Sequence, residues 1–189
     1  MATARESRLA ALLAAGAVWG AAEATLFFIV PDVLITFVAT RRLGRAVMVS
    51  LAATAGAVAG GLAMYMWGRH DAAGATAALA HVPAVTTKML ARVASQLQAG
   101  GVSALFLGPL TGAPYKIYAV ESGAAGMSAV GFLLISVPAR LARFALLAVL
   151  TAAVRQRLLS RWPQRKVDAL TTVSWAIFYA AYFFSVAGS

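Results

Sequence analysis

The sequence contains no cysteine and few charged residues. Of its 189 residues, 12% are Asp, Glu, Lys or Arg, whereas about 25% is usual for a soluble domain. The absence of cysteine excludes disulfides and thiolate metal sites. Hydrophobic residues make up 61% of the chain, and the mean hydropathy is +0.81. These proportions predict an all-α polytopic membrane protein, and the length predicts a single membrane domain over residues 1–189.

The charges that are present are mostly basic, with a formal net charge of +10. A basic chain can bind nucleic acid, but here the basic residues cluster at the ends of apolar runs, in 41–45 and 155–168. This arrangement is typical of cytoplasmic loops that face anionic lipid, so we expect no nucleic-acid partner. A signal peptide over residues 5–22 is a weaker alternative, because Glu23 and a further apolar run follow directly.

Three runs are apolar enough to predict membrane-spanning helices: 46–67, 127–154 and 169–187, the last rich in aromatic residues at its far end. Each has the roughly 20 residues that a span needs. The less apolar segment 72–101 has hydrophobic residues at helical spacing, such as Leu90, Val93 and Leu97. It predicts an amphipathic helix at the membrane surface or against the bundle.

Two further stretches are broken. Residues 9–40 are too long for one span and are interrupted at Pro31, and residues 107–126 contain Gly108, Pro109, Gly112 and Pro114. Broken backbone at membrane depth is tolerated only where protein buries it or where it lines a wet cavity. With the basic loops in the cytoplasm, the first stretch enters from the cytoplasmic side, the second from the outer side, and the C-terminus lies outside. This predicts an arrangement like an inverted repeat with two re-entrant elements.

Glycines at a spacing of four residues predict close helix packing. Gly16 and Gly20 form one such pair in the first run. Gly56, Gly60 and Gly61 form a second group in the run 46–67.

Glu23 and Asp32 are carboxylates within apolar surroundings, on either side of the first break. Ionisable residues at membrane depth are costly and are functional candidates by default. If the chain turns near Pro31, both carboxylates face one cavity and are candidates for proton coupling. The alternative is structural: Asp32 caps a helix and Glu23 pairs with an arginine.

Arg140 and Arg143 are three residues apart, so they share one face of the predicted helix 127–154. Arginine presents a fixed fork of donors that suits phosphate or carboxylate. They are therefore candidate substrate-binding residues. The alternative is a structural pair with Glu23, Asp32 or Glu121.

Tyr115 and Lys116 follow the second break directly. A lysine beside broken helix ends and free backbone N–H groups is suited to an anionic headgroup. In the alternative, Lys116 is solvated at the outer interface. Glu121 is a candidate for proton coupling or simply balances the lysine. The sequence has no nucleophile motif, phosphate-binding loop, metal cluster or cofactor motif, so an enzyme is not expected.

The sequence resembles the DedA family, also called the VTT or SNARE-associated domain superfamily. The resemblance covers about residues 9–154, followed by the basic loop 155–168 and the C-terminal helix 169–187. It is carried by Glu23 with Pro31, Asp32 and Leu34; by Gly56 and Gly60 with Tyr65, Gly68 and Arg69; and by the stretch 108–126 with Ser122 and Gly123. The chain departs from the family where many members have an arginine motif and this sequence has Pro114, Tyr115 and Lys116. In this respect the sequence resembles a divergent branch of the family.

The resemblance implies a lipid transporter of the bacterial inner membrane. Family members are associated with moving undecaprenyl phosphate or phospholipids between leaflets, and proton coupling is expected. An uncoupled scramblase or small-solute transporter is one alternative, and a non-transporting scaffold for envelope integrity is another. The sequence leaves the oligomeric state open, a homo-oligomer included.

Overall fold

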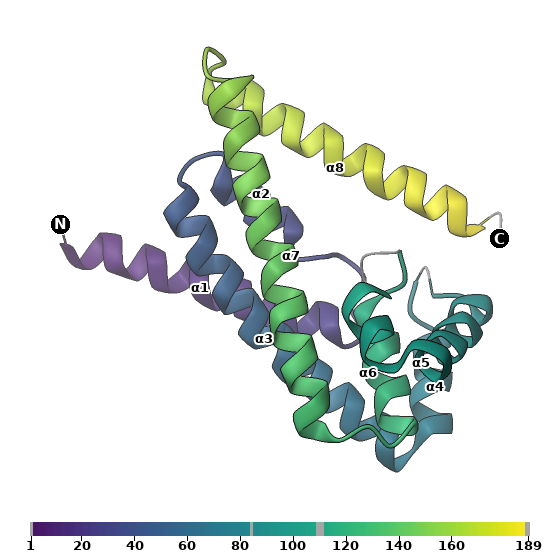
Figure 1. The fold of residues 1–189 in the computed structure, drawn as a ribbon. Coiled ribbons are helices and arrows are strands. Elements are labelled where there is room, and N and C mark those ends of the chain that lie inside the picture. Colours follow the sequence, from purple (N-terminus) through teal and green to yellow (C-terminus); the bar gives the residue numbers. More distant parts are fainter. Residues whose placement is uncertain (1, 84, 109–111, 188–189) are drawn as a thin grey trace.

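The computed structural model describes residues 2–83, 85–108 and 112–187, and in this part of the chain the regular secondary structure is all helix, joined by turns and loops (Figure 1). Its helices are α1 (Ala2–Ala24), α2 (Asp32–Ala39), α3 (Leu43–His70), α4 (Ala72–Ala80), α5 (Thr87–Leu107), α6 (Tyr115–Ala124), α7 (Ala129–Arg157) and α8 (Gln164–Ala187). The predicted all-α class is confirmed.

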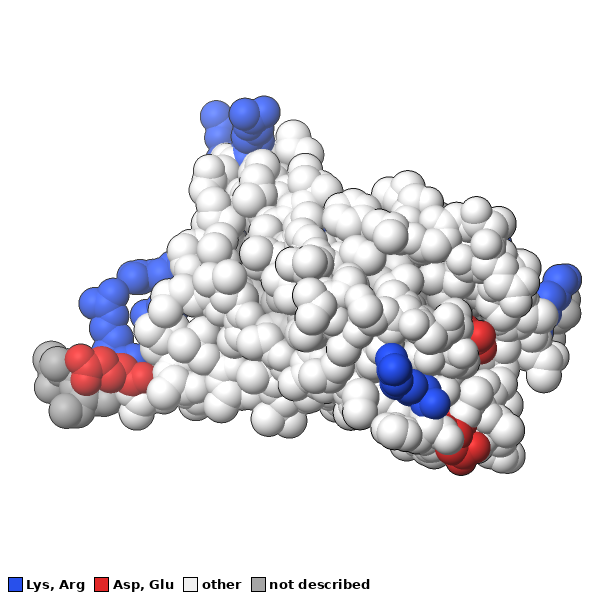
Figure 2. All heavy atoms as spheres, turned by 60° about the horizontal axis from the view of Figure 1, so that its bottom comes forward, with Lys and Arg blue, Asp and Glu red and all other residues white. Residues whose placement is uncertain are grey.

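Three of these helices are long and apolar enough to cross a membrane: α3, α7 and the segment Gln164–Ser185 of α8. They correspond to the three predicted spans, and they indicate a membrane protein. Figure 2 shows a broad uncharged surface, with Lys and Arg gathered in separate groups away from its middle. The basic loop is shorter than predicted, because α7 continues to Arg157 and α8 already begins at Gln164.

Helix α1 packs chiefly against α3, and the two cross closely (Figure 1). The predicted glycines lie at this crossing. A Cβ at Gly20 would overlap the backbone of Ala53, and a Cβ at Gly56 would overlap the carbonyl of Ala17. The prediction of close packing through small residues is therefore confirmed for this pair of helices. Gly61 has a different role, because it accommodates the ring of Tyr115 from α6.

The first broken stretch is a non-helical segment between α1 and α2. Helix α1 ends at Ala24, seven residues before Pro31, where the sequence predicted the interruption. Side chains satisfy part of the exposed backbone: the Trp19 indole N–H donates to the Ile29 carbonyl at 2.9 Å, and the Thr25 hydroxyl lies 2.9 Å from the Ala22 carbonyl. Such pairing is what buried irregular backbone requires.

The prediction of a single helix over residues 72–101 is wrong. The structure has two helices there, α4 and α5. They are separated around Pro83, which has no N–H to continue a helix. Helix α5 then continues to Leu107, with a kink at Gly101, whose φ is +46°. Its apolar face, including Leu90 and Val93, is buried, and α5 packs on α6 and α7. Of the two placements predicted for this segment, packing against the bundle is therefore the one observed.

The second broken stretch lies between α5 and α6, as predicted. Helix α5 ends at Leu107, and α6 begins at Tyr115 after Pro114. Pro109 lies outside the described residues. Gly112 has a φ of +100°, a conformation that glycine adopts readily. Helix α6 packs closely on α3, since a Cβ at Gly123 would overlap the backbone of Tyr65.

Candidate functional site

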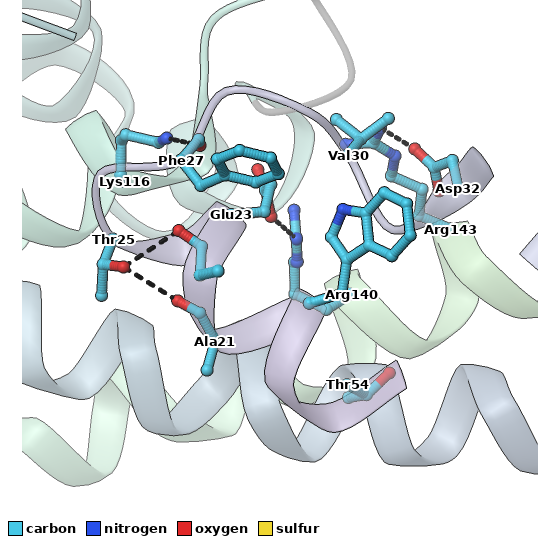
Figure 3. Close-up of polar contacts among 12 residues, drawn as sticks. Ala21, Glu23, Thr25, Phe27, Val30, Asp32, Thr54, Lys116, Arg140 and Arg143 are labelled. Carbon is cyan, nitrogen blue, oxygen red and sulfur yellow. Dashed lines mark hydrogen bonds and ion pairs between the residues drawn. The ribbon is translucent and has the colours of Figure 1, made fainter. Parts of the chain in front are cut away.

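Two ion pairs connect the first broken stretch to the middle of α7 (Figure 3). Arg140 pairs with Glu23 at the end of α1, and Arg143 pairs with Asp32 at the start of α2. The two arginines share a face of α7, as their spacing predicted. Asp32 is the first residue of α2, and Pro31 occupies the N-cap position. One turn of α7 is thus paired with residues on both sides of the break between α1 and α2.

Arg140 is the most enclosed of these charges, with a side chain only 2% exposed. Its guanidinium carbon lies 4.7 Å from the ring centroid of Tyr115 and 4.8 Å from that of Phe144. Cation–π contacts of this kind are strongest where water is excluded. Within the described residues, Nε and Nη1 of Arg140 have no hydrogen-bond partner, and neither does Oδ1 of Asp32. The two ion pairs therefore retain hydrogen-bonding capacity.

Lys116 connects the two broken stretches. It lies in the first turn of α6, is only 2% exposed, and its Nζ donates to the backbone carbonyl of Phe27 between α1 and α2 (Figure 3). The alternative in which Lys116 is solvated at an interface is therefore wrong. Glu121 lies on the next turn of α6, is half-buried, and forms no ion pair within the described part of the chain.

A cavity of about 220 Å³ lies beside these charges. Four of the predicted site residues line it: Glu23, Tyr115, Lys116 and Arg143. Its other walls come from the two broken stretches, the α4–α5 connection and α8, through Phe28, Val30, Val82, Pro83, Val85, Gly112, Ala113, Pro114, Phe178, Tyr179 and Tyr182. The cavity is smaller than the roughly 300–1,000 Å³ of pockets for drug-sized ligands, so it suits a compact group rather than a whole lipid.

Not every predicted site residue reaches this cavity. Arg140 and Asp32 lie behind it as the partners of Glu23 and Arg143, and Glu121 is not part of its lining. Together the two ion pairs and Lys116 contain three cations and two carboxylates. Lys116 is hydrogen-bonded to a neutral carbonyl, which does not balance its charge. The cluster therefore has a formal surplus of one positive charge.

Sequence reasoning did not assign α8 to the site. Phe178, Tyr179 and Tyr182 form an aromatic wall of the cavity, and the Tyr179 hydroxyl accepts from the Val30 N–H at 2.9 Å. Trp175 belongs to the same face of the helix. The sequence does indicate this aromatic wall, because the aromatic residues at positions 175, 178, 179 and 182 have the spacing of one helical face.

No protein-family model, curated protein or solved structure matches this chain. The resemblance to the DedA family accordingly stays a prediction from the motifs. Two further motif residues contact each other: the Arg69 guanidinium donates to the Tyr65 hydroxyl at 3.0 Å, and that hydroxyl donates to the carbonyl of Met127. They connect the end of α3 to the turn before α7.

Proposed function

We propose that this chain is an inner-membrane lipid transporter of the DedA type, which binds an anionic headgroup in the cavity and moves the lipid between leaflets. One observation supports this proposal most directly. Lys116 brings an additional positive charge to a cavity between two broken stretches and is bonded there to a neutral carbonyl. A phosphate group is the compact anion that would neutralise this surplus.

The same arrangement supports proton coupling. Arg143 lines the cavity and is paired with Asp32, so an arriving phosphate competes with that carboxylate for the guanidinium. An Asp32 carboxylate that loses its partner is stabilised by taking up a proton from water. Departure of the headgroup restores the ion pair and releases the proton. A membrane potential contributes about 2.3 kcal/mol per charge per 100 mV, enough to bias such a cycle.

We also propose that both broken stretches are re-entrant, with the basic ends at 41–45 and 155–166 in the cytoplasm. Under this topology α8 carries the C-terminus to the outer side. A fusion of alkaline phosphatase to the C-terminus is therefore expected to be active, and a fusion of a cytoplasmic reporter inactive. The reverse pattern would show that the topology is wrong.

A second candidate function, a non-transporting scaffold, is favoured by a different observation. Glu23 and Asp32 are each paired with an arginine, and Arg140 is enclosed by aromatic rings. In a scaffold these charges only hold helices together.

The deciding experiment is a leaflet-flipping assay in vesicles that contain the purified full chain. Labelled polyprenyl phosphate and labelled phospholipid are compared with and without a proton gradient. Lys116→Met is expected to lower the flux of the anionic lipid by about tenfold or more, because a lost hydrogen bond to a charged group costs about 1.5–3 kcal/mol. Lys88→Met is the matched control, since Lys88 is an exposed lysine on α5.

The outcomes separate the candidate functions. Absence of flux for both lipids with the wild-type chain would contradict the transporter. Folded Lys116→Met and Glu23→Gln variants with wild-type behaviour in cells would favour the scaffold. Flux that depends on Lys116 but ignores pH and potential would identify an uncoupled scramblase.

A further inference from the structure

A separate recess and groove lie where α7 and α8 join, away from the cavity at Lys116. The recess is polar and is lined by Thr40, Arg41, Arg155, Gln156, Ser160 and Gln164. An apolar groove continues from it, sharing Thr40 and Arg155, between α7 and α8. Its walls include Leu150 and Val154 on α7 and Leu170 and Trp175 on α8. The two together form one elongated site with a polar end and an apolar body.

The polar end has two arginines that the fold holds in place. The Arg41 guanidinium donates to the Phe37 carbonyl and to Asp168, both at 2.8 Å. The Arg155 guanidinium donates to the Leu159 carbonyl. A guanidinium has five N–H donors, so each arginine retains donors for a ligand. Two cations beside one carboxylate leave this end positively charged.

The apolar groove covers about two turns of α8. Its lining on this helix runs from Val167 to Trp175, which corresponds to about 12 Å of helix. This is most of the roughly 15 Å of half the hydrocarbon core of a bilayer. The groove ends where the Trp175 indole N–H donates to Thr36 of α2 at 2.9 Å. A ligand with a charged head and an apolar chain fits this shape.

We propose that this site binds one anionic glycerophospholipid, with its phosphate between Arg41 and Arg155 and an acyl chain in the groove. The arginine fork suits phosphate, and the net positive charge favours an anionic headgroup over a zwitterionic one. This site shares no lining residue with the cavity at Lys116, and the inference does not depend on transport.

The bound lipid has a structural consequence for α8. Only 6% of the apolar window of this helix is buried within the protein, against 50% for α3. Polar contacts described between α8 and the region of α2 include the Arg41–Asp168 ion pair. The Gln164 amide also donates a hydrogen bond to the Thr40 hydroxyl at 3.3 Å. A lipid that fills the groove adds packing between α7 and α8 and holds α8 in place.

The test measures binding of phosphatidylglycerol to the purified full chain in phosphatidylcholine nanodiscs, by native mass spectrometry and by thermal unfolding. Gln156→Glu and Arg161→Gln both lower the net charge by one at exposed positions, but only Gln156 lines the recess. Gln156→Glu is expected to weaken binding about tenfold, because it places a like charge near the phosphate. Arg161→Gln is expected to change binding by less than about twofold.

A second variant tests the groove without changing charge. Thr171→Phe fills the groove from α8 and is expected to abolish the rise in unfolding temperature that phosphatidylglycerol produces in the wild-type chain. Inorganic phosphate alone is expected to produce no such rise. The inference is wrong if the two charge variants weaken binding equally, which indicates diffuse attraction. It is also wrong if phosphatidylcholine competes as well as phosphatidylglycerol, if free phosphate reproduces the effect, or if Thr171→Phe binds like the wild type.

Discussion

Replacing Arg140 with methionine is expected to lower the free energy of unfolding by about 3–5 kcal/mol, the usual cost of removing one partner from a buried ion pair. The Glu23 carboxylate, whose side chain is 5% exposed, would remain without its cation. The contacts of the guanidinium with Tyr115 and Phe144 would also be lost. Equilibrium unfolding in mixed micelles, followed by tryptophan fluorescence, measures the loss.

Arg143→Met is the matched control for this prediction. Arg143 is one turn away on the same helix and also pairs with a carboxylate, but its side chain is 26% exposed. Water can partly replace it, so the expected loss is smaller. The double variant Glu23→Gln with Arg140→Met removes both charges and is expected to recover much of the loss. Equal losses for Arg140→Met and Arg143→Met, or no recovery in the double variant, would contradict the assignment.

The double variant also bears on function. If it is stable and still moves lipid, the Glu23–Arg140 pair only positions α1 against α7. If it is stable and transport stops, Glu23 takes part in the cycle through the cavity that it lines. Stability and flux measured on the same protein separate these two roles.

The membrane-spanning helices could be predicted from the sequence because their signal is local. A run of about 20 apolar residues has few alternatives. The close packing of α1 on α3 was predictable for a similar reason, since glycines at a spacing of four mark one helix face. The wrong prediction of one helix over residues 72–101 also has a local cause, because Pro83 interrupts the hydrophobic pattern and separates α4 from α5.

The partners within the site were harder to predict because they depend on long-range geometry. The spacing of Arg140 and Arg143 predicts a shared face, but three carboxylates were available to them. Which arginine meets Glu23 depends on how α1 and α2 approach α7. The contact of Lys116 with the Phe27 carbonyl carries no side-chain signature at all, because every residue has a carbonyl. Only the course of the first broken stretch determines which one lies there.

Gly56→Ala is expected to destabilise the protein although alanine is the better helix former. The added Cβ would overlap the Ala17 carbonyl, which belongs to rigid helix backbone and has no rotamer to change. Overpacking of this kind costs about 1–3 kcal/mol. That cost exceeds the gain of about 1 kcal/mol in helix propensity. Gly56→Leu would force α1 further from α3.

Gly44→Ala is the matched control, because Gly44 also lies in α3 and a Cβ there would meet nothing within 4 Å. It is expected to leave stability unchanged or raise it slightly. Because Glu23 lies on α1, displacement of this helix by Gly56→Leu would also move its carboxylate away from Arg140. We therefore expect Gly56→Leu to lose stability and lipid flux together. Equal unfolding free energies for Gly56→Ala and Gly44→Ala would show that α1 and α3 do not pack this closely in the membrane.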